Sequence, residues 1–320
     1  MRLPELPELP KSSVALAGTF TNGHPMSVGK RLQSYAVKTP IRLLAVDIDG
    51  TLTDSHFKIS ASNIAALRAA HEAGVQIMLA TGRRHDFALP VARELGVPVC
   101  LATSNGALIR SMDGETFYAD RLPAGTARKL IRHMEGFRGN AVLTFDRRGH
   151  DALVLETMEE LTHSVSRWLE TNRQHIQYIS PLEDSLNGED PIQAMFCGRV
   201  VRMEEAQQRL QESDFLHEIT ILRTQYNHRD LSILDILNHG CSKGHAVRRW
   251  AEKQGIPRGQ IMAIGDNYND LEMLEFAGVP VVMGNAPEEL KQPGWQVTTT
   301  NDQSGVAHAV QEILGLAFKG

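Results

Sequence analysis

The sequence predicts an α/β fold in which a core built on a parallel sheet is interrupted by an inserted α+β domain. Short apolar runs alternate with amphipathic helical stretches from Ile41 to about Tyr118, and again from near Leu231. This alternation is typical of buried parallel strands joined by right-handed helical crossovers. Between the two parts the alternation lapses, although further strands are expected there. The core is therefore predicted to be split in the sequence, with a second unit inserted into it.

The first core segment is expected to contain three strands and two helices. The strands are continuous apolar runs, as expected for strands covered on both faces, and they occupy residues 43–46, 75–80 and 97–102. The first helix begins after Ser60 or Ser62 as its N-cap and ends before Gly74, where a left-handed cap is favoured. The second helix includes residues 91–95 and precedes the third strand.

The inserted segment lacks this regular order. Its expected strands lie at residues 142–145, 152–155, 192–196 and 219–222, and its helical stretches lie at 159–170 and 203–212. The core pattern then returns, with helices expected at 243–253, 270–277 and 304–314 and strands at 261–264 and 279–282. The predicted domains are an extension over residues 1–38, a core over 39–120 and 229–320, and an inserted domain over 121–228. The extension opens with closely spaced prolines that disfavour helix and central strand, so we expect it to be mobile.

Composition excludes several classes of partner. Apolar residues make up 42% of the 320-residue chain, and the 33 basic and 38 acidic residues give a formal net charge of -5. No strong positive field is available for nucleic acid or an anionic membrane, and no apolar run approaches the ~20 residues that span a bilayer. The three cysteines, Cys100, Cys197 and Cys241, are too dispersed for a disulfide framework or a thiolate zinc site. We expect a cytoplasmic protein, monomeric or weakly homo-oligomeric, that acts on a small molecule.

Acidic residues follow two of the expected strands directly. The segment Asp47-Ile48-Asp49-Gly50-Thr51 follows the first strand, and Gly265-Asp266-Asn267-Tyr268-Asn269-Asp270 follows a later one. The first segment is not an EF-hand loop, because Leu52 replaces the required glycine and Lys58 replaces the last glutamate. Since chemistry gathers at the carboxyl ends of parallel strands, the two clusters are expected to hold one Mg²⁺ ion together.

Two further segments are suited to binding phosphate. Thr81-Gly82-Arg83-Arg84 ends the second strand, where a hydroxyl and successive backbone amides can form an anion-binding turn. Lys243 opens a helix after Gly240-Cys241-Ser242 and can present its ammonium group to phosphate oxygens.

With these four motifs in this order, the sequence resembles the haloacid dehalogenase (HAD) superfamily of aspartate-nucleophile phosphatases, particularly its Cof-type branch. The resemblance covers about residues 41–320 and implies a Rossmann-like parallel-sheet core with an inserted α+β cap of the C2 type. It implies that Asp47 is the nucleophile and Asp49 the general acid and base. The implied phosphate ligands are Ile48, Thr81, Gly82, Lys243 and Asn269, and the implied metal ligands are Asp47, Asp49, Asp266 and Asp270. Two features depart from the family pattern. One is the long extension before Ile41, and the other is Arg84, at a position where the family often has proline.

The expected function is Mg²⁺-dependent hydrolysis of small phosphorylated metabolites, such as sugar phosphates or phosphorylated cofactors, through an aspartyl-phosphate. Attack by Asp47 on phosphorus divides one difficult displacement into two easier ones. Asp49 would protonate the leaving oxygen and then deprotonate the incoming water. The cap would close over this site and select substrates, moving on a paired hinge near residues 118–123 and 226–230.

The same residues also suggest other functions for the chain. Ser242 lies in a G-x-S-x-G sequence with His308 downstream, as in a serine hydrolase, but the preceding apolar run ends before the motif and no HGGG-type segment is present. A dehalogenase would have no use for Asp49, and a non-catalytic phosphate sensor is expected to have lost Asp47 or Asp49. A phosphomutase shares all the core residues and stays open.

The remaining candidates are less specific. Arg84 and Asn105 are candidate substrate contacts, although Asn105-Gly106 also fits a turn leading from the core to the cap. The histidines form no metal-ligand spacing, and the three tryptophans, Trp168, Trp250 and Trp295, are expected in cores or amphipathic helices. The sequence identifies neither the physiological substrate nor the cap residues that contact it.

Overall fold

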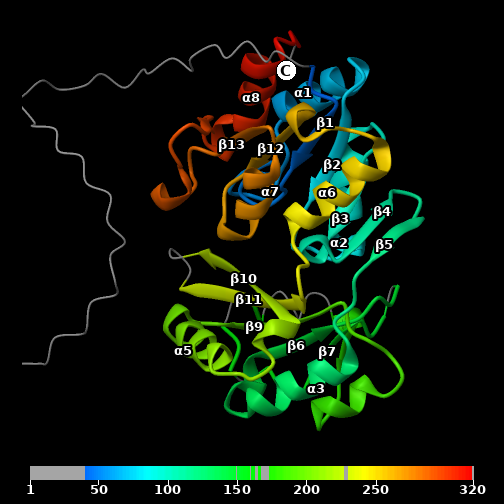
Figure 1. The fold of residues 1–320 in the computed structure, drawn as a ribbon, viewed down its shortest axis with the longest axis vertical. Coiled ribbons are helices and arrows are strands. Elements are labelled where there is room, and N and C mark those ends of the chain that lie inside the picture. The colour runs from blue at the N-terminus through cyan, green and yellow to red at the C-terminus, as the bar shows by residue number, and fades with distance from the viewer. Residues whose placement is uncertain are drawn as a thin grey trace, which may run out of the picture. The chain divides into compact units, whose positions relative to one another are not determined.

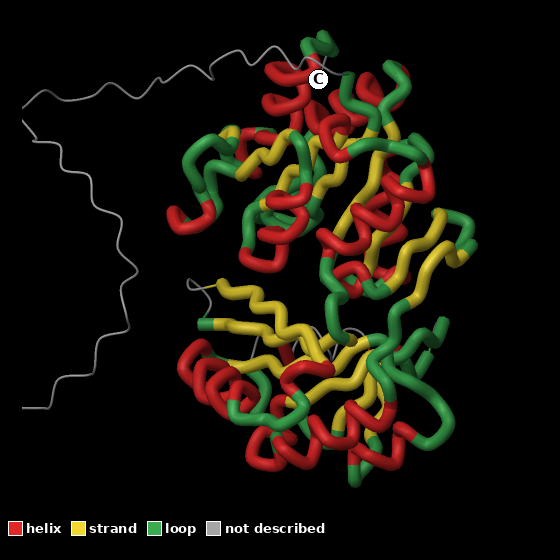
Figure 2. The backbone as a smooth tube through the Cα atoms, in the orientation of Figure 1, coloured by secondary structure: helices red, strands yellow, loops and turns green. Residues whose placement is uncertain are grey.

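The computed structural model describes residues 40–148, 150–158, 160–162, 165–166, 173–226 and 230–318. The predicted extension over residues 1–38, Trp168 and most of the expected helix 159–170 lie outside the described residues. The described chain forms two separate sheets with their helices (Figures 1 and 2). The eight-stranded sheet with its helices is called the core below, and the six-stranded sheet with its helices is called the cap.

The core contains the elements that the alternating pattern predicts. Its strands are β1 (Leu43–Val46), β2 (Gln76–Ala80), β3 (Cys100–Thr103), β4 (Leu108–Ser111), β5 (Thr116–Ala119), β12 (Ile261–Gly265), β13 (Val279–Val282) and β14 (Gln296–Val297). Its helices are α1 (Ala61–Glu72), α2 (His85–Leu95), α6 (Lys243–Gln254), α7 (Leu271–Phe276) and α8 (Gly305–Leu314). Ser60 caps α1 by accepting a hydrogen bond from the backbone N–H of Asn63 at 3.1 Å, which confirms one of the two predicted caps.

The core sheet is parallel at its centre and places β1 beside β12. The strand order is β14-β13-β12-β1-β2-β3-β4-β5, parallel as far as β3 and antiparallel for β4 and β5. Alternate residues of β1 belong to two apolar clusters. Leu44 and Val46 pack with α1, α2 and α8, whereas Leu43 and Ala45 pack with α6 and α7. The sheet is therefore covered on both faces, which explains its uninterrupted apolar strands. The sequence missed β4 and β5 because both are short and β5 has no continuous buried run.

The cap contains a six-stranded sheet, and its described helices α3 (Ala124–His133) and α5 (Val200–Gln211) pack on one face of that sheet. Its strands are β6 (Ala141–Thr144), β7 (Leu153–Leu155), β8 (Ile176–Tyr178), β9 (Gln193–Gly198), β10 (Ile219–Tyr226) and β11 (Leu231–Asn238). The order is β10-β11-β9-β6-β7-β8, antiparallel except for the β7–β8 pair. Leu130 of α3 and Met203 of α5 pack in one cluster with Phe196 and Leu234 of the sheet.

The expected return to the core at residue 229 is wrong. Strand β11 pairs with β9 and β10, so the cap sheet continues to Asn238. The apolar run was misleading because β11 is covered on both sides: Leu234 faces the cap helices, whereas Leu237 packs with Ala107 and Leu108 of the core. Of the second predicted hinge segment, Tyr226 ends β10 and Asp230 precedes β11, two strands that pair within the cap, and residues 227–229 lie outside the described residues.

The chain passes between the sheets after β5 and after β11. Asn238 Nδ2 donates a hydrogen bond to Asp120 Oδ1 at 2.6 Å, which ties the two connections together. Only the first of the two expected hinge segments, near residues 118–123, coincides with a connection between core and cap.

Candidate active site

Three buried carboxylates converge at the carboxyl end of the core sheet. Asp47 follows β1 and continues its pairing, since its backbone N–H donates to Ile264 O at 3.0 Å. Asp266 follows the neighbouring strand β12, and Asp270 lies in the short helical turn Tyr268–Asp270. One carboxylate oxygen from each lies within 4.8 Å of the others. The two acidic motifs meet as the sequence predicts, because they end adjacent parallel strands.

Lys243 provides the cation among these acids. Its buried Nζ donates to Asp47 Oδ1 and to Asp270 Oδ1, each at 2.6 Å. The second oxygen of Asp270 accepts from the backbone N–H groups of Asp266 and Asn267, each at 3.0 Å. Asp270 is thus held from both sides. Among the described residues nothing is found to donate to Asp47 Oδ2, so this oxygen has no protein donor.

The cluster carries more negative charge than Lys243 neutralises. Burial, together with the nearby Asp270, raises the pKa of Asp47 from 3.8 to about 7, although Lys243 opposes this. Burial and the charges of Asp47 and Asp270 likewise raise the pKa of Asp266 well above its usual range. Despite its own burial, Lys243 has a raised pKa because Asp270 and Asp47 stabilise its charge. A divalent cation with oxygen ligands would relieve this repulsion, so the donor set fits Mg²⁺.

Asp49 does not join the carboxylate cluster. Arg83 Nε donates to Asp49 Oδ2 at 2.7 Å, and Arg83 Nη2 donates to Oδ1 at 2.5 Å. The side chain of Asp49 is 26% exposed, unlike the buried carboxylates. A bidentate ion pair thus holds the Asp49 side chain outside the cluster, and the role of Asp49 as a metal ligand stays a prediction. The sequence missed Arg83 as a functional residue, although it belongs to the Thr-Gly-Arg turn singled out there.

The turn at Gly50 brings the two acidic loops together. Gly50 has φ of +84°, and a Cβ at this position would collide with the carboxylate of Asp266. Thr51 Oγ1 donates to Asp266 Oδ1 at 2.8 Å, and Asn285 Nδ2 donates to Gly50 O at 2.8 Å. Asn285 carries no motif that would have revealed it.

The expected phosphate-binding turn lies at the end of β2. Thr81 is buried, and its Oγ1 accepts a hydrogen bond from Arg83 N–H at 3.1 Å. Gly82 lies beside Asn105, with the Asn105 Oδ1 atom 3.4 Å from where a Cβ of Gly82 would be. The side chain of Ile48 is buried in the core, so a phosphate contact there would come from its backbone N–H.

A family model described as haloacid dehalogenase-like hydrolase matches residues 44–310. The chain belongs to this family. The matched range includes all four motifs and the inserted cap.

Curated relatives and solved structures agree with this assignment. Phosphatase YwpJ of Bacillus subtilis (strain 168) is 28% identical over 291 residues, which covers 86% of this chain and 100% of that protein. Pyridoxal phosphate phosphatase YbhA of Escherichia coli (strain K12) is 28% identical over 278 residues, or 85% of this chain and 98% of that protein. A haloacid dehalogenase-like hydrolase from Bacteroides thetaiotaomicron superposes with a TM-score of 0.70 at 28% identity, covering 85% of this chain and 99% of that one. The expected superfamily, fold class and enzyme class are confirmed.

The HAD-like core is connected to the cap by a buried chain of polar side chains. Asn105, at φ of +53°, donates from Nδ2 to Asp235 Oδ2 of β11 at 2.9 Å. Its Oδ1 accepts from Asn269 Nδ2 at 2.9 Å. Gln193 Nε2 donates to the other oxygen of Asp235 at 3.1 Å. Both ends of the Asn105 amide are thus engaged within the protein, which favours positioning of Asn269 over direct substrate contact.

A second cap residue, Tyr226, approaches the catalytic acids. Burial raises the pKa of Tyr226, and the charges of Asp49, Asp266 and Asp47 raise it further. Strand β10 also contacts the turn Tyr268–Asp270, which carries one of the clustered carboxylates. No sequence motif marks this tyrosine, because its nearness to the acids depends on how the cap sheet meets the core.

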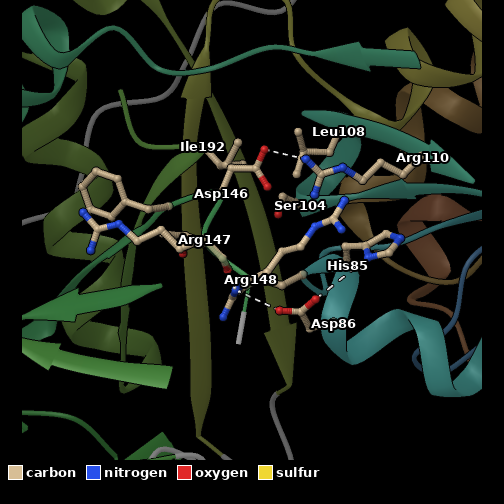
Figure 3. A pocket seen from close by; sticks show the side chains of 12 residues that line it. His85, Asp86, Ser104, Leu108, Arg110, Asp146, Arg147, Arg148 and Ile192 are labelled. Carbon is tan, nitrogen blue, oxygen red and sulfur yellow. Dashed lines mark hydrogen bonds and ion pairs between the residues drawn. The ribbon is translucent and has the colours of Figure 1, made fainter. Parts of the chain in front are cut away.

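Arg84 lines a pocket, and its printed polar contacts are with Asp86 and Arg147, not with the clustered carboxylates. The pocket is lined from both the core and the cap, by Arg84, His85, Asp86, Ser104, Leu108 and Arg110 and by Thr144, Phe145, Asp146, Arg147, Arg148 and Ile192. Figure 3 shows side chains from both parts directed toward one another.

The serine-hydrolase alternative does not fit the geometry. Ser242 is the N-cap of α6, and its Oγ accepts from His245 N–H at 3.1 Å and donates to the carboxylate of Glu272. Among the described residues, no histidine side chain bonds to Ser242, and His308 Nδ1 instead lies 3.4 Å from Thr298 Oγ1. The serine therefore has a structural partner in place of a general base. In the part of the chain that the structure describes, we find no helix long and apolar enough to span a membrane.

Proposed function

We propose that this chain is a Mg²⁺-dependent phosphatase that hydrolyses small phosphorylated metabolites through an aspartyl-phosphate on Asp47. The observation that carries the proposal is the buried cluster of Asp47, Asp266 and Asp270 around Lys243. The pyridoxal phosphate phosphatase among its relatives supports a phosphorylated cofactor as one substrate class. We further propose that the enzyme acts in the cytoplasm as a monomer or weak homo-oligomer.

Asp47 is the proposed nucleophile. Its Oδ2 attacks phosphorus while Oδ1 remains bonded to Lys243, and the bond from phosphorus to the leaving oxygen breaks. Asp49, which is partly exposed, gives a proton to that oxygen and then takes one from the water that hydrolyses the acyl-phosphate. Arg83 orients Asp49 through its two hydrogen bonds.

The transferred phosphoryl group needs donors around its oxygens. Lys243 supplies a charge, and Thr81 and Asn269 supply a hydroxyl and an amide. Backbone N–H groups of Ile48 and Gly82 complete the proposed set. Asn105 holds Asn269 in place through the 2.9 Å hydrogen bond to its amide.

Asp47, Asp49, Asp266 and Asp270 are the proposed metal ligands. Three of them form the buried cluster, and Asp270 also keeps Lys243 and the Asp266 loop in position. A bound Mg²⁺ ion would supply positive charge that neutralises the carboxylates and the phosphate. The cap residues, Tyr226 among them, are proposed to exclude water and to select substrates.

The test is phosphate release from an aryl phosphate and from a panel of phosphorylated metabolites, with Mg²⁺ and with excess chelator. Asp47→Asn should abolish turnover, because an amide is a very poor nucleophile, whereas the control Asp214→Asn at an exposed cap position should not. Mass spectrometry should locate a trapped phosphoryl group on Asp47. Full activity in chelator, or phosphate trapped on another residue, would contradict the proposal.

A phosphomutase would use the same residues but return the phosphoryl group to a second hydroxyl. Turnover in ¹⁸O-labelled water separates the two reactions. We expect one labelled oxygen in each released phosphate, whereas isomerised phosphorylated product without label would favour the mutase.

A further inference from the structure

The pocket beside the active site has a surplus of positive charge. Four of its lining residues are arginines, whereas only Asp86 and Asp146 are acidic. Asp146 is already shared, because Arg110 Nη2 lies 2.5 Å and Arg121 Nη2 lies 3.2 Å from its Oδ2. Arg147 Nη2 lies 2.8 Å from Glu189 Oε2, and Arg84 Nη2 lies 3.4 Å from Asp86 Oδ2. Among the described residues, Arg148 is therefore the lining arginine without a carboxylate partner.

Arg84 has a buried donor without a partner. Its side chain is only 10% exposed, and its Nη2 donates to Arg147 O at 2.9 Å and lies 3.4 Å from Asp86 Oδ2. Its Nη1 is buried and has no hydrogen-bond partner among the described residues. Burial accordingly lowers the pKa of Arg84. A desolvated charged donor is costly unless an acceptor replaces its lost water, so this atom requires an acceptor in the pocket, either a water or an anion.

Other donors border the same space. Arg148 is exposed at the pocket, and its Nη2 donates to Gly114 O at 3.0 Å, which leaves further N–H groups of its guanidinium available. The hydroxyl-bearing Ser104 lines the pocket from the core. Guanidinium groups with a hydroxyl are the donors that an oxyanion such as phosphate prefers.

The pocket and the catalytic centre share a wall. Arg83 bonds to Asp49, whereas the adjacent Arg84 lines the pocket. Asn105 bonds to Asn269, whereas the adjacent Ser104 lines the pocket. Since both the core and the cap contribute lining residues, an anion in the pocket would contact both and hold them together.

We propose that this pocket is a second anion site, in which Arg84 and Arg148 bind a phosphate-class oxyanion that bridges the core and the cap. Two sources share this chemistry, free inorganic phosphate and a second phosphate group on the substrate. Only the second source rests on the phosphatase function proposed above.

The first test is calorimetric titration of inorganic phosphate into the full chain in the presence of Mg²⁺, which neutralises the carboxylates beside Lys243. The wild-type chain is expected to bind two anions, one at Lys243 and one in the pocket. Arg84→Gln and Arg148→Gln should each lose one, whereas Arg93→Gln, at an exposed position of α2, should keep both. Arg148 is exposed, so its variant stays informative even if Arg84→Gln does not fold. If Lys243→Met still bound two phosphate ions, this result would contradict the proposed catalytic site but not the proposed anion site in the pocket.

The second test separates the two sources. The ratio of kcat/KM for a sugar bisphosphate to that for the matching monophosphate is measured in each variant. A fall of about tenfold or more in Arg84→Gln and Arg148→Gln would identify the second phosphate of the substrate. An unchanged ratio with lost phosphate binding would identify free phosphate. Retention of both the phosphate stoichiometry and the ratio in the two variants would overturn the proposal.

Discussion

Replacing Asp235 by asparagine is expected to stabilise the folded chain at alkaline pH and to bring little gain at acidic pH. Asp235 lies on β11, is 5% exposed, and accepts hydrogen bonds from Asn105 and Gln193. Burial raises its pKa from 3.8 to about 7, although the Asn105 hydrogen bond and the charge of Lys243 oppose this. The carboxyl group therefore holds its proton more tightly in the folded chain than in the unfolded chain.

The direction in which stability changes with pH follows from the linkage between folding and proton binding by Asp235. Below about pH 4 both states are protonated and the group costs the fold little. As the pH rises from 3.8 towards 7, the unfolded chain loses the proton first, so stability falls until the folded chain also ionises. At 1.36 kcal/mol per pKa unit the penalty is about 4 kcal/mol at pH 8 and about 1 kcal/mol at pH 4.5. Asparagine cannot ionise, and it avoids this penalty.

The surrounding residues can accept the amide. Its oxygen can still accept from Asn105, and its NH₂ group can donate to Gln193 Oε1 once that amide rotates. Gln193 Oε1 is buried and has no partner among the described residues, and after the rotation Nε2 takes its place. The number of unsatisfied atoms is therefore unchanged, and the Asn105 contact stays in place.

Urea unfolding of the wild-type chain and of Asp235→Asn at pH 8 and pH 4.5 measures the effect. The stability difference between the two proteins should change by about 3 kcal/mol between these pH values, and the exposed control Asp214→Asn should show no comparable change. The same difference at both pH values would refute the reasoning, because it would mean that Asp235 does not titrate with a raised pKa.

Three further outcomes are expected. Lys243→Met should lower kcat by about 10²-fold or more. In chelator it should also destabilise the chain by about 3–5 kcal/mol, because the buried carboxylates lose their cation. Thermal unfolding should show that Mg²⁺ partly restores the lost stability, and equal stability of the variant and the wild-type chain would contradict this. Ser242→Ala should cost about 1 kcal/mol through loss of the α6 cap while phosphatase activity persists, whereas lost activity in folded protein would revive the serine-hydrolase alternative. Tyr226→Phe should change the ranking of kcat/KM among phosphorylated metabolites, with little effect on acetyl phosphate; an unchanged ranking would remove Tyr226 from substrate selection.

The sequence alone determined the features that depend on local burial and backbone geometry. The apolar runs of β1, β2 and β12 identified buried parallel strands, because an unbroken apolar run indicates that both faces of a strand are covered. The acids after β1 and β12 could then be brought to one edge of a sheet, since parallel strands end there together. Ser60 and Gly50 were predictable for the same local reason, as a helix cap and a turn.

Tertiary structure alone decided which polar partners each side chain has. Arg83 and Arg84 are adjacent and chemically alike, yet only Arg83 reaches Asp49, whereas Arg84 faces the pocket. The bond between Asn105 and Asp235 joins residues far apart in the chain, and no periodicity encodes it. Strand β11 was misassigned because an apolar run reports that a strand is covered and does not report which sheet supplies its neighbours. Hydrogen-bond partners are set by the packing of the cap against the core, and that geometry exists only in the folded chain.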